Sequence, residues 1–315
     1  MCAANNNASN YTVKQTIAIA QKKEEEMKII VSLLKNLSRV ERKLTKTNFS
    51  LCLVERIIFS IIKKVQPLPP VKKIKEISGN VIWTAWFQGV SAAPDLVLCC
   101  ISSFGNINNS NVIVITKENL SDYIEIPINI LNKYRAGMIS NTAFSEIVRI
   151  ELLSTYGGLW LDSTVFITSK IEYPVLGGFF TLKGVSKLKC GEFSGLTPVY
   201  MIGCEEGYKP ILEIRENLLS YWMVNDNQID YYLIDYIFKL EMLGNLSFKR
   251  DVDALPIIGM KRFKLSGVIN EIYNEDNWQE LMGESMAYKL TNKSDVCCFV
   301  DGKKTFFKKI KEEYK

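Results

Sequence analysis

Short apolar runs separated by amphipathic stretches dominate the chain from residue 81 onward. The runs VIWTAW at 81–86 and NVIVIT at 111–116 have the length and the β-branched and aromatic content of buried strands. Between them, Pro94 suits the first turn of a helix that we expect to extend to about residue 104. A strand, a helix and a second strand in this order predict a βαβ unit with parallel strands.

The best delimited helix of the sequence lies directly before a third apolar run. Polar cap candidates at 140–142 begin this helix, and the Gly-Gly pair at 157–158 ends it. The run LWLDSTVFI at 159–167 predicts one strand that carries Asp162 and Thr164 on the same face. Burial of a carboxylate in such a run costs free energy unless cations or hydrogen-bond donors compensate it. Asp162 is therefore a candidate functional residue, although taken alone it would more often cap a neighbouring turn.

The rest of the chain continues the alternation of strands and helices. No internal repeat and no G-x-G-x-x-G dinucleotide fingerprint is present. The pattern therefore predicts an α/β nucleotide-binding fold without that fingerprint. We expect strands at 178–183 and 199–203, helical segments within 119–136, and helices at 209–224 and 229–242.

The first 75 residues form a basic arm in front of a mildly acidic body. They hold 15 Lys and Arg against 5 Asp and Glu, which leaves 24 basic against 29 acidic residues in the remainder. Residues 12–48 predict a helix with interleaved charges, and 51–65 predict a more apolar one, followed by a proline-rich linker. We therefore divide the chain into a basic helical arm with its linker, 1–75, and an α/β domain, 76–315.

Two alternatives exist for the apolar helix 51–65. It packs on the main domain, or it lies on an anionic membrane face with its lysines at the headgroups. Nucleic acid is not expected as a partner, because the lysines of the arm are not interleaved with stacking aromatic residues. No apolar run reaches the roughly 18 residues of a membrane helix, and the start MCAANNNASN does not resemble a signal peptide. We expect a cytoplasmic protein, peripheral on the inner membrane face if the second alternative holds.

The absence of histidine excludes several mechanisms at once. Ser-His and Cys-His nucleophile pairs, His general bases and His-based zinc sites cannot form. The eight cysteines contain no C-x-x-C pair, so a zinc clamp is not expected either. Acid, base or metal chemistry must therefore come from carboxylates, hydroxyls, lysines or thiols.

Two charged residues of the helix before Asp162 complete a candidate site. Glu146 and Arg149 are three positions apart and share a face of this helix away from its apolar residues. Because two glycines join the helix to the strand, the end of the helix and Asp162 must lie close together. Carboxylates, an arginine and a tight glycine turn can together surround a ribose and a diphosphate. The alternative is an ordinary surface ion pair between Glu146 and Arg149.

At this point the motifs resemble those of a known family. The segment ISNTAFSEIVRIELLSTYGGLWLDSTVF (139–166) is similar to the signature of DXD-type sugar-nucleotide glycosyltransferases, in particular the capsular polysaccharide synthesis branch, which is like glycosyltransferase family 32. Three further segments resemble motifs of that branch in the same order: WTAWFQG (83–89), NQIDYYLIDYIF (227–238) and YKLTNK (288–293). The resemblance does not cover the N-terminal 75 residues.

The resemblance implies a GT-A (Rossmann-like) nucleotide-sugar-binding fold with an N-terminal helical extension. Carried over to this sequence, it places Trp86 on or beside the nucleotide base and Arg149 at the diphosphate or sugar of the donor. Glu146 stands where the family usually has Asp and would contact the ribose or the donor sugar. Gln88 and Gly158, which belong to the same motifs, complete this part of the expected donor site.

The resemblance also implies a metal site and a catalytic acid. Asp162 would be the first acid of the DXD motif, and Thr164 stands where the stricter motif has its second, metal-binding Asp. A divalent cation, Mn²⁺ or Mg²⁺, is therefore expected on Asp162 and Thr164, although a hydroxyl is a poorer ligand than a carboxylate. Asp230 would lie near the donor sugar or acceptor, as a candidate catalytic residue beside Asp162 and Arg149. The residues expected to neutralise the diphosphate are Lys289, Thr291 and Lys293.

The function that these motifs imply is transfer of a hexose from a UDP- or GDP-sugar to a glycan acceptor. The acceptor is expected to be lipid-linked, in capsule or surface polysaccharide biosynthesis, and the anomeric configuration is expected to be retained. Retention proceeds either through a covalent intermediate, with Asp230 as a candidate nucleophile, or by attack from the leaving group's own side, which we favour. The alternatives are a non-catalytic sugar-nucleotide-binding or scaffold protein and a sugar-phosphate or nucleotidyl transferase.

Overall fold

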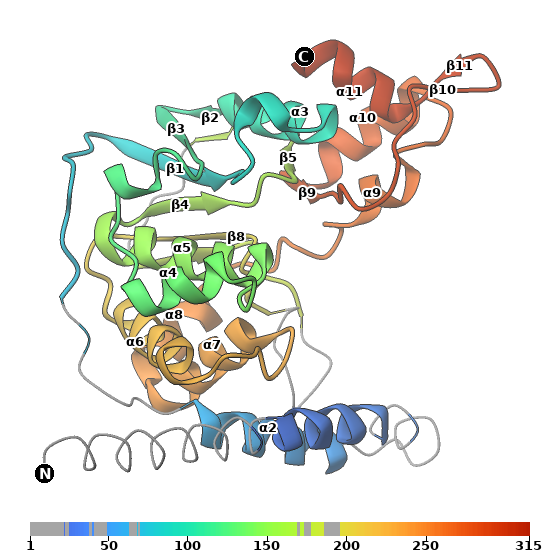
Figure 1. Ribbon diagram of the computed structural model, residues 1–315. Coiled ribbons are helices and arrows are strands. Elements are labelled where there is room, and N and C mark those ends of the chain that lie inside the picture. The colour runs from blue at the N-terminus through green and yellow to red at the C-terminus, as the bar shows by residue number, and fades with distance from the viewer. Residues whose placement is uncertain are drawn as a thin grey trace, which may run out of the picture.

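The computed structural model shows a central sheet covered by helices on both faces (Figure 1). It describes residues 25–37, 49–62, 70–168, 178–185 and 196–315, the two-residue strand β6 (Ile171–Glu172) and the single residues 22, 40 and 68. Within this part of the chain, none of the helices combines the length and the apolar character that crossing a bilayer requires.

Five strands form the central sheet in the order β3-β1-β4-β8-β7. β1 pairs in parallel with both β3 and β4, whereas β8 runs antiparallel to its neighbours β4 and β7. The predicted βαβ unit is confirmed, because α3 (Asp95–Ser103) connects β1 to β3. The predicted α/β class is confirmed, and the mainly parallel sheet agrees with a GT-A-like arrangement. The strand bounds are β3 Ser110–Ile115, β1 Asn80–Ala85, β4 Gly158–Leu161, β8 Met201–Cys204 and β7 Phe179–Thr181.

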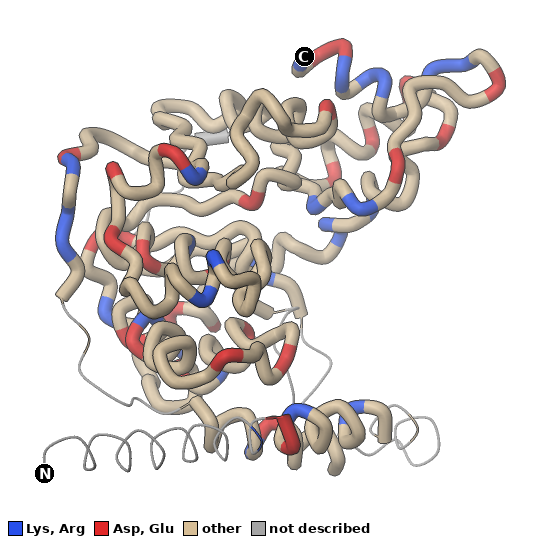
Figure 2. The backbone as a smooth tube through the Cα atoms, in the orientation of Figure 1, with Lys and Arg blue, Asp and Glu red and all other residues tan. Residues whose placement is uncertain are grey.

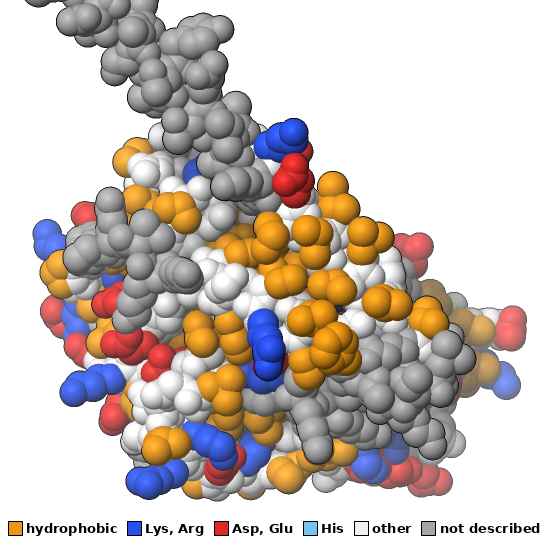
Figure 3. Space-filling model, turned by 90° about the horizontal axis from the view of Figure 1, so that it is seen from below, with side chains coloured by type: hydrophobic (Ala, Val, Ile, Leu, Met, Phe, Trp, Pro, Cys, Tyr) orange, Lys and Arg blue, Asp and Glu red, His pale blue; other side chains and the backbone are white. Residues whose placement is uncertain are grey.

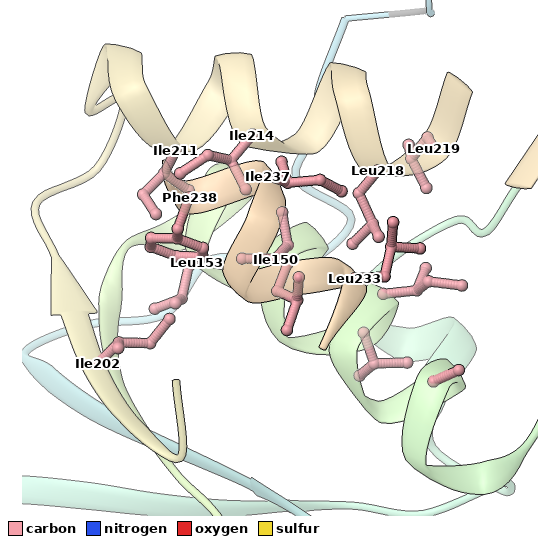
Figure 4. Packing of buried hydrophobic residues seen from close by; sticks show 14 of the residues in the cluster. Ile150, Leu153, Ile202, Ile211, Ile214, Leu218, Leu219, Leu233, Ile237 and Phe238 are labelled. Atoms are coloured by element: carbon pink, nitrogen blue, oxygen red, sulfur yellow. The ribbon is translucent and has the colours of Figure 1, made fainter. Parts of the chain in front are cut away.

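Three long helices cover one face of the sheet. α5 (Asn141–Tyr156) begins at Ser140, whose side chain accepts a hydrogen bond from the Ala143 amide, and ends at Gly157, as predicted. α6 (Lys209–Val224) packs on α5, and α7 (Leu233–Gly244) packs on α6. Aliphatic side chains of all three helices and Ile202 of β8 meet in this layer (Figure 4). α4 (Ile128–Arg135) and α8 (Leu246–Ala254) lie on the same side of the sheet (Figure 1).

The alternation of side chains along the strands separates two hydrophobic clusters. Trp83, Trp160 and Ile202 belong to the cluster that contains α5, α6 and α7. Their neighbours Ile82, Leu159, Leu161 and Met201 belong to a second cluster on the other face. Since both faces are buried, these strands are mostly apolar.

The C-terminal third adds helices and short strand pairs beside α3. α11 (Phe306–Tyr314) packs on α3, and a third hydrophobic cluster joins α3 to this region. No element was predicted from the sequence beyond residue 242. The remaining elements are α9 Lys264–Val268, α10 Glu275–Glu284, β2 Ile107–Asn108, β10 Phe299–Val300, β11 Lys303–Lys304, η1 Val90–Ala92, η2 Phe104–Asn106 and η3 Leu120–Asp122.

The prediction of one continuous strand over 159–167 is wrong. The chain leaves the sheet after β4, and the Val165 amide donates a hydrogen bond to the Asp162 carbonyl, which closes a turn. It then forms β5 (Val165–Ile167), which pairs with β9 (Ala287–Lys289) outside the central sheet. The turn places Asp162 and Thr164 at the carboxyl end of β4.

The described part of the arm packs on the main domain. α2 (Phe49–Ile61) packs against α7, and its fully buried Val54 and Ile58 belong to the same cluster as α5, α6 and α7. Glu55 of α2 forms an ion pair with the buried Lys239 of α7. For residues 51–61, packing on the domain is therefore the arrangement observed. Of the predicted helix 12–48, residues 25–37 are helical, and most of the remainder lies outside the described residues. The boundary at residue 75 stays a prediction.

Gly158 is confined by β1, which lies beside it. Its φ is 96°, and a Cβ built on it would lie 2.6 Å from Val81 Cγ1 and 2.9 Å from the Val81 carbonyl oxygen. We expect Gly158→Ala to lower the free energy of unfolding by about 2 kcal/mol or more, because strand backbone cannot move aside cheaply. Chemical denaturation measures this change. Gly283→Ala is the matched control, since Gly283 lies in α10 with open space around it, and equal stability of the two variants would contradict the prediction.

Candidate active site

A cleft of about 850 Å³ opens at the carboxyl ends of β1 and β4. In open α/β sheets this edge is where ligands bind, and the volume is that of a small-molecule site. Basic positions on the C-terminal segments around β9 lie close to an acidic position at the end of β4 (Figure 2). The structure brings nine of the predicted site residues to the cleft: Trp86, Gln88, Glu146, Arg149, Asp162, Thr164, Lys289, Thr291 and Lys293.

The carboxylate of Asp162 is the centre of the polar contacts in the cleft. Its Oδ1 accepts hydrogen bonds from Arg149 Nη2 at 2.7 Å and from Trp160 Nε1 at 2.8 Å, and its Oδ2 accepts one from Lys289 Nζ at 2.8 Å. Burial by itself would raise the pKa of Asp162, but the charges of Lys289 and Arg149 and the hydrogen bonds from Lys289 and Trp160 lower it below its usual value. Asp162 is therefore ionised at neutral pH and holds two cations in place.

Lys289 reaches Asp162 through the pairing of β9 with β5. Lys289 stands opposite Val165 in this ladder, and the Leu290 amide donates a hydrogen bond to the Thr164 carbonyl at 2.8 Å. The register brings the ammonium to 2.6 Å from Thr164 Oγ1, in addition to its contact with Asp162. Lys289 therefore bridges Asp162 and Thr164, the two residues predicted from the sequence to be metal ligands.

Arg149 contacts Asp162 and an aromatic ring, and some of its hydrogen-bond donors are unused. It projects from α5 and is 4 % exposed, and its guanidinium carbon lies 5.0 Å from the centre of the Trp160 ring. Its Nε and Nη1 are buried and have no hydrogen-bond partner. Buried donors without a partner are rare in folded proteins, so they mark Arg149 as ready to bind an anionic ligand.

The pKa of Glu146 is shifted in the opposite direction to that of Asp162. It is 6 % exposed, and its Oε2 is buried without a hydrogen-bond partner. Burial raises the pKa of Glu146 to about 8; Arg149 opposes this shift, whereas Asp235 and Asp162 add to it. Near neutral pH the side chain is mostly protonated, so it can donate a hydrogen bond to a sugar or ribose hydroxyl.

Aromatic and hydroxyl groups line the rest of the cleft. The indole Nε1 of Trp86 is buried without a hydrogen-bond partner, and the residue follows directly after β1. Thr291 Oγ1 accepts a hydrogen bond from the Lys293 amide at 3.2 Å, which shapes the loop after β9. A cleft lined by an aromatic side chain and a set of cations matches a ligand that contains a base and phosphates.

Two predicted residues do not reach the cleft. Asp230 forms an ion pair with Lys35 of the helical segment 25–37, and its Oδ1 accepts a hydrogen bond from the Tyr232 amide at 2.8 Å. It is not among the residues that line the cleft. Gly158 lies against Val81 and serves the packing of β4 on β1.

Several further residues line the cleft that were not selected from the sequence, among them Asp235, Arg262 and Tyr200. Asp235, at the first turn of α7, is the second acid of the segment NQIDYYLIDYIF (227–238), whose first acid is Asp230. This segment marks both acids as candidates, and only the position of α7 decides which of them faces the cleft. Arg262, whose buried Nε has no hydrogen-bond partner, and Tyr200 also line it. No motif in the sequence pointed to these two.

The residues nominated for a divalent cation do not fit one in this arrangement. Both oxygens of Asp162 are occupied by donors, and Lys289 fills the position between Asp162 and Thr164. Among the residues that the structure describes, no three His, Cys, Asp or Glu side chains are grouped so that they could hold a metal. Mg²⁺ and Mn²⁺ prefer oxygen ligands, and the ammonium and guanidinium beside Asp162 repel a divalent cation. The expectation of Mn²⁺ or Mg²⁺ stays a prediction.

Comparison with known proteins identifies the family. Residues 31–310 match the family model described as capsular polysaccharide synthesis protein, so the chain belongs to this family. The match begins within the helical segment 25–37, inside the arm. Among solved structures, one titled "PaToxG Glycosyltransferase" has 13% sequence identity and a TM-score of 0.41, with 79% of this chain and 99% of that chain covered. This similarity is too low to assign a function. No curated protein matches the chain.

The raised pKa of Glu146 predicts a specific dependence of stability on pH. Between its ordinary value of 4.5 and about 8 the folded state keeps the proton that the unfolded state releases. The free energy of unfolding therefore falls as pH rises through this window and levels off above it. We expect Glu146→Gln, which mimics the protonated acid, to abolish a drop on the order of a few kcal/mol. Urea denaturation across the pH series measures it, and parallel pH profiles of the two proteins would contradict the assignment.

Proposed function

We propose that the protein is a glycosyltransferase that moves a hexose from a UDP- or GDP-sugar to a glycan acceptor in capsular polysaccharide synthesis. The observation that carries this proposal is the convergence of Arg149 and Lys289 on Asp162, at the carboxyl ends of two parallel strands. Membership of the capsular polysaccharide synthesis family supports it.

The charges of the cleft suit departure of a nucleoside diphosphate. Four cationic side chains line it against three carboxylates: Arg149, Arg262, Lys289 and Lys293 against Glu146, Asp162 and Asp235. Because Glu146 is mostly protonated near neutral pH, the net charge of the cleft is more positive than this count of side chains suggests. Preorganised cations that meet charge as it develops on a leaving group lower the barrier to transfer. Trp86 would contact the base at the other end of the donor.

We propose that the anomeric configuration is retained, with the acceptor attacking from the side of the departing diphosphate. A covalent intermediate needs an ionised carboxylate that is free to attack. Asp162 is engaged by Arg149, Trp160 and Lys289, and Glu146 is mostly protonated. Asp230, the candidate nucleophile from the sequence, is paired with Lys35 and is not among the residues that line the cleft. These contacts favour same-side attack over a covalent intermediate on Asp162, Glu146 or Asp230.

The test of the reaction is donor turnover by Asp162→Asn. We expect this variant to lose about 100-fold or more of the wild-type turnover, because Arg149 and Lys289 lose the anion that positions them. A panel of UDP- and GDP-sugars is incubated with the protein, and the released nucleotide is identified by chromatography. Asp253→Asn is the matched control, since Asp253 is exposed and forms an ion pair with Lys249 on α8.

The released product also separates the alternatives. Nucleoside diphosphate supports a glycosyltransferase, whereas nucleoside monophosphate or pyrophosphate identifies a sugar-phosphate or nucleotidyl transferase. Donor binding without turnover in the wild type identifies a non-catalytic sugar-nucleotide-binding or scaffold protein. Unchanged turnover in Asp162→Asn refutes the proposed site.

We further propose that the acceptor is lipid-linked and that the face formed by α2 and the helical segment 25–37 lies on an anionic membrane. Seen from below, hydrophobic side chains gather on this side of the molecule (Figure 3). Leu33 and Leu37, one helical turn apart, are 63% and 54% exposed, and Phe49 at the start of α2 is 69% exposed. The opposite side of the same segment packs inward through Val31, which is 2% exposed. Exposed apolar groups on a basic arm suit the interface of an anionic bilayer.

The membrane proposal is tested by substitution, because deletion of residues 1–75 would remove the buried Val54 and Ile58 from the core. We expect Leu33→Gln with Leu37→Gln to weaken binding to vesicles of phosphatidylglycerol and phosphatidylcholine about tenfold, with unchanged turnover of a water-soluble acceptor. Co-sedimentation measures the binding. Phe299→Ser on β10, another exposed apolar residue, is the control. Equal sedimentation of the double variant and the wild type contradicts the membrane role.

A further inference from the structure

We infer that Lys289 supplies the positive charge that a divalent cation would otherwise supply, so that this site binds a nucleoside diphosphate without a metal ion. The inference rests on the proposed function for the transfer step, but its statement about diphosphate binding can be tested without turnover. The ammonium of Lys289, and not a cation bound to Asp162 and Thr164, would then neutralise the charge of the diphosphate.

The backbone, rather than the flexibility of its side chain, holds Lys289 at this position. The β5–β9 ladder aligns Lys289 with Val165, and the Lys289 amide donates a hydrogen bond to the Arg262 carbonyl at 2.7 Å. Its ammonium lies 2.8 Å from Asp162 Oδ2 and 2.6 Å from Thr164 Oγ1. The residue after it is fixed in the same way, through the bond from the Leu290 amide to the Thr164 carbonyl. The side chain is 20 % exposed, so its charge still faces the cleft.

A divalent cation at Asp162 would have to displace existing contacts. Arg149, Trp160 and Lys289 already donate to the two carboxylate oxygens. A cation placed there would also stand beside an ammonium and a guanidinium, and like charges at such distances repel strongly inside a protein. The chain offers Thr164 in place of a second acid, so the ligand set is poorer than an oxygen site for Mn²⁺ or Mg²⁺ requires.

The remaining cations of the cleft complete a binding site for the diphosphate. Nε and Nη1 of Arg149 and Nε of Arg262 are buried donors without partners, and Arg262 lies in the turn directly before α9. Together with the ammonium of Lys289 they offer charge-assisted hydrogen bonds to phosphate oxygens. Asp162 then acts as a positioning residue that aligns Lys289 and Arg149, instead of as a metal ligand.

The test compares nucleotide binding with and without metal. Calorimetry with UDP and with GDP is carried out in EDTA and again in MnCl₂. We expect the wild type to bind with equal affinity in both, and Lys289→Met to bind about tenfold or more weakly in both. Lys289→Arg, which keeps the charge, should recover part of the affinity. Lys249→Met, an exposed lysine on α8, should behave like the wild type. Circular dichroism checks that each variant is folded.

A second readout does not depend on nucleotides. Mn²⁺ is titrated into the wild type and into Asp162→Asn, and the bound ion is counted by electron paramagnetic resonance. We expect the two proteins to bind equal amounts. One equivalent of Mn²⁺ that is lost in Asp162→Asn would overturn the inference, as would UDP or GDP binding that EDTA abolishes and MnCl₂ restores. Absence of binding of both nucleotides under both conditions would overturn it as well.

The outcomes keep the two proposals apart. Sugar-nucleotide turnover that requires Mn²⁺ supports the glycosyltransferase and refutes the role of Lys289. Metal-free nucleotide binding that is lost in Lys289→Met, in a protein without turnover of any donor, supports the role of Lys289 and refutes the glycosyltransferase.

Discussion

The structure around the cleft depends on how cations and hydrogen-bond donors compensate the buried negative charge of one carboxylate. Asp162 follows a buried strand, where an ionised acid is costly unless donors surround it. The donors come from α5, from β4 itself and from β9, so a single side chain connects the two consecutive elements α5 and β4 with β9, which is far away in the sequence. Lys289 is 127 positions away from Asp162. The same contacts that make burial of the acid tolerable also fix two cations where an anionic ligand can meet them.

Two neighbouring acids of the cleft illustrate how environment decides chemistry. Cations and hydrogen bonds keep the pKa of Asp162 low, whereas burial and nearby carboxylates raise the pKa of Glu146. One acid therefore holds charge, and the other can donate a proton in a hydrogen bond. Divergent pKa values within one cleft are typical of functional sites.

The sheet and most of the helices could be predicted from local patterns. The βαβ unit, the caps of α5 and the extent of α6 follow from apolar periodicity and from Pro, Gly and Ser at element ends. The break after β4 could not be predicted, because Leu159, Leu161, Val165 and Ile167 keep one alternation across it and all reach the same cluster. Only pairing with β9, a long-range contact, moves β5 out of the central sheet.

The sequence by itself determined the residue types of the site, through motifs that gave nine residues lining the cleft. Tertiary structure alone decided which of two acids in one motif faces it: the position of α7 presents Asp235, while Asp230 pairs with Lys35. It also decided that Lys289 stands between Asp162 and Thr164. The physical reason is range. Capping, turn chemistry and periodicity act over a few residues, whereas the partner of a buried charge is set by the packing of segments that no local pattern relates.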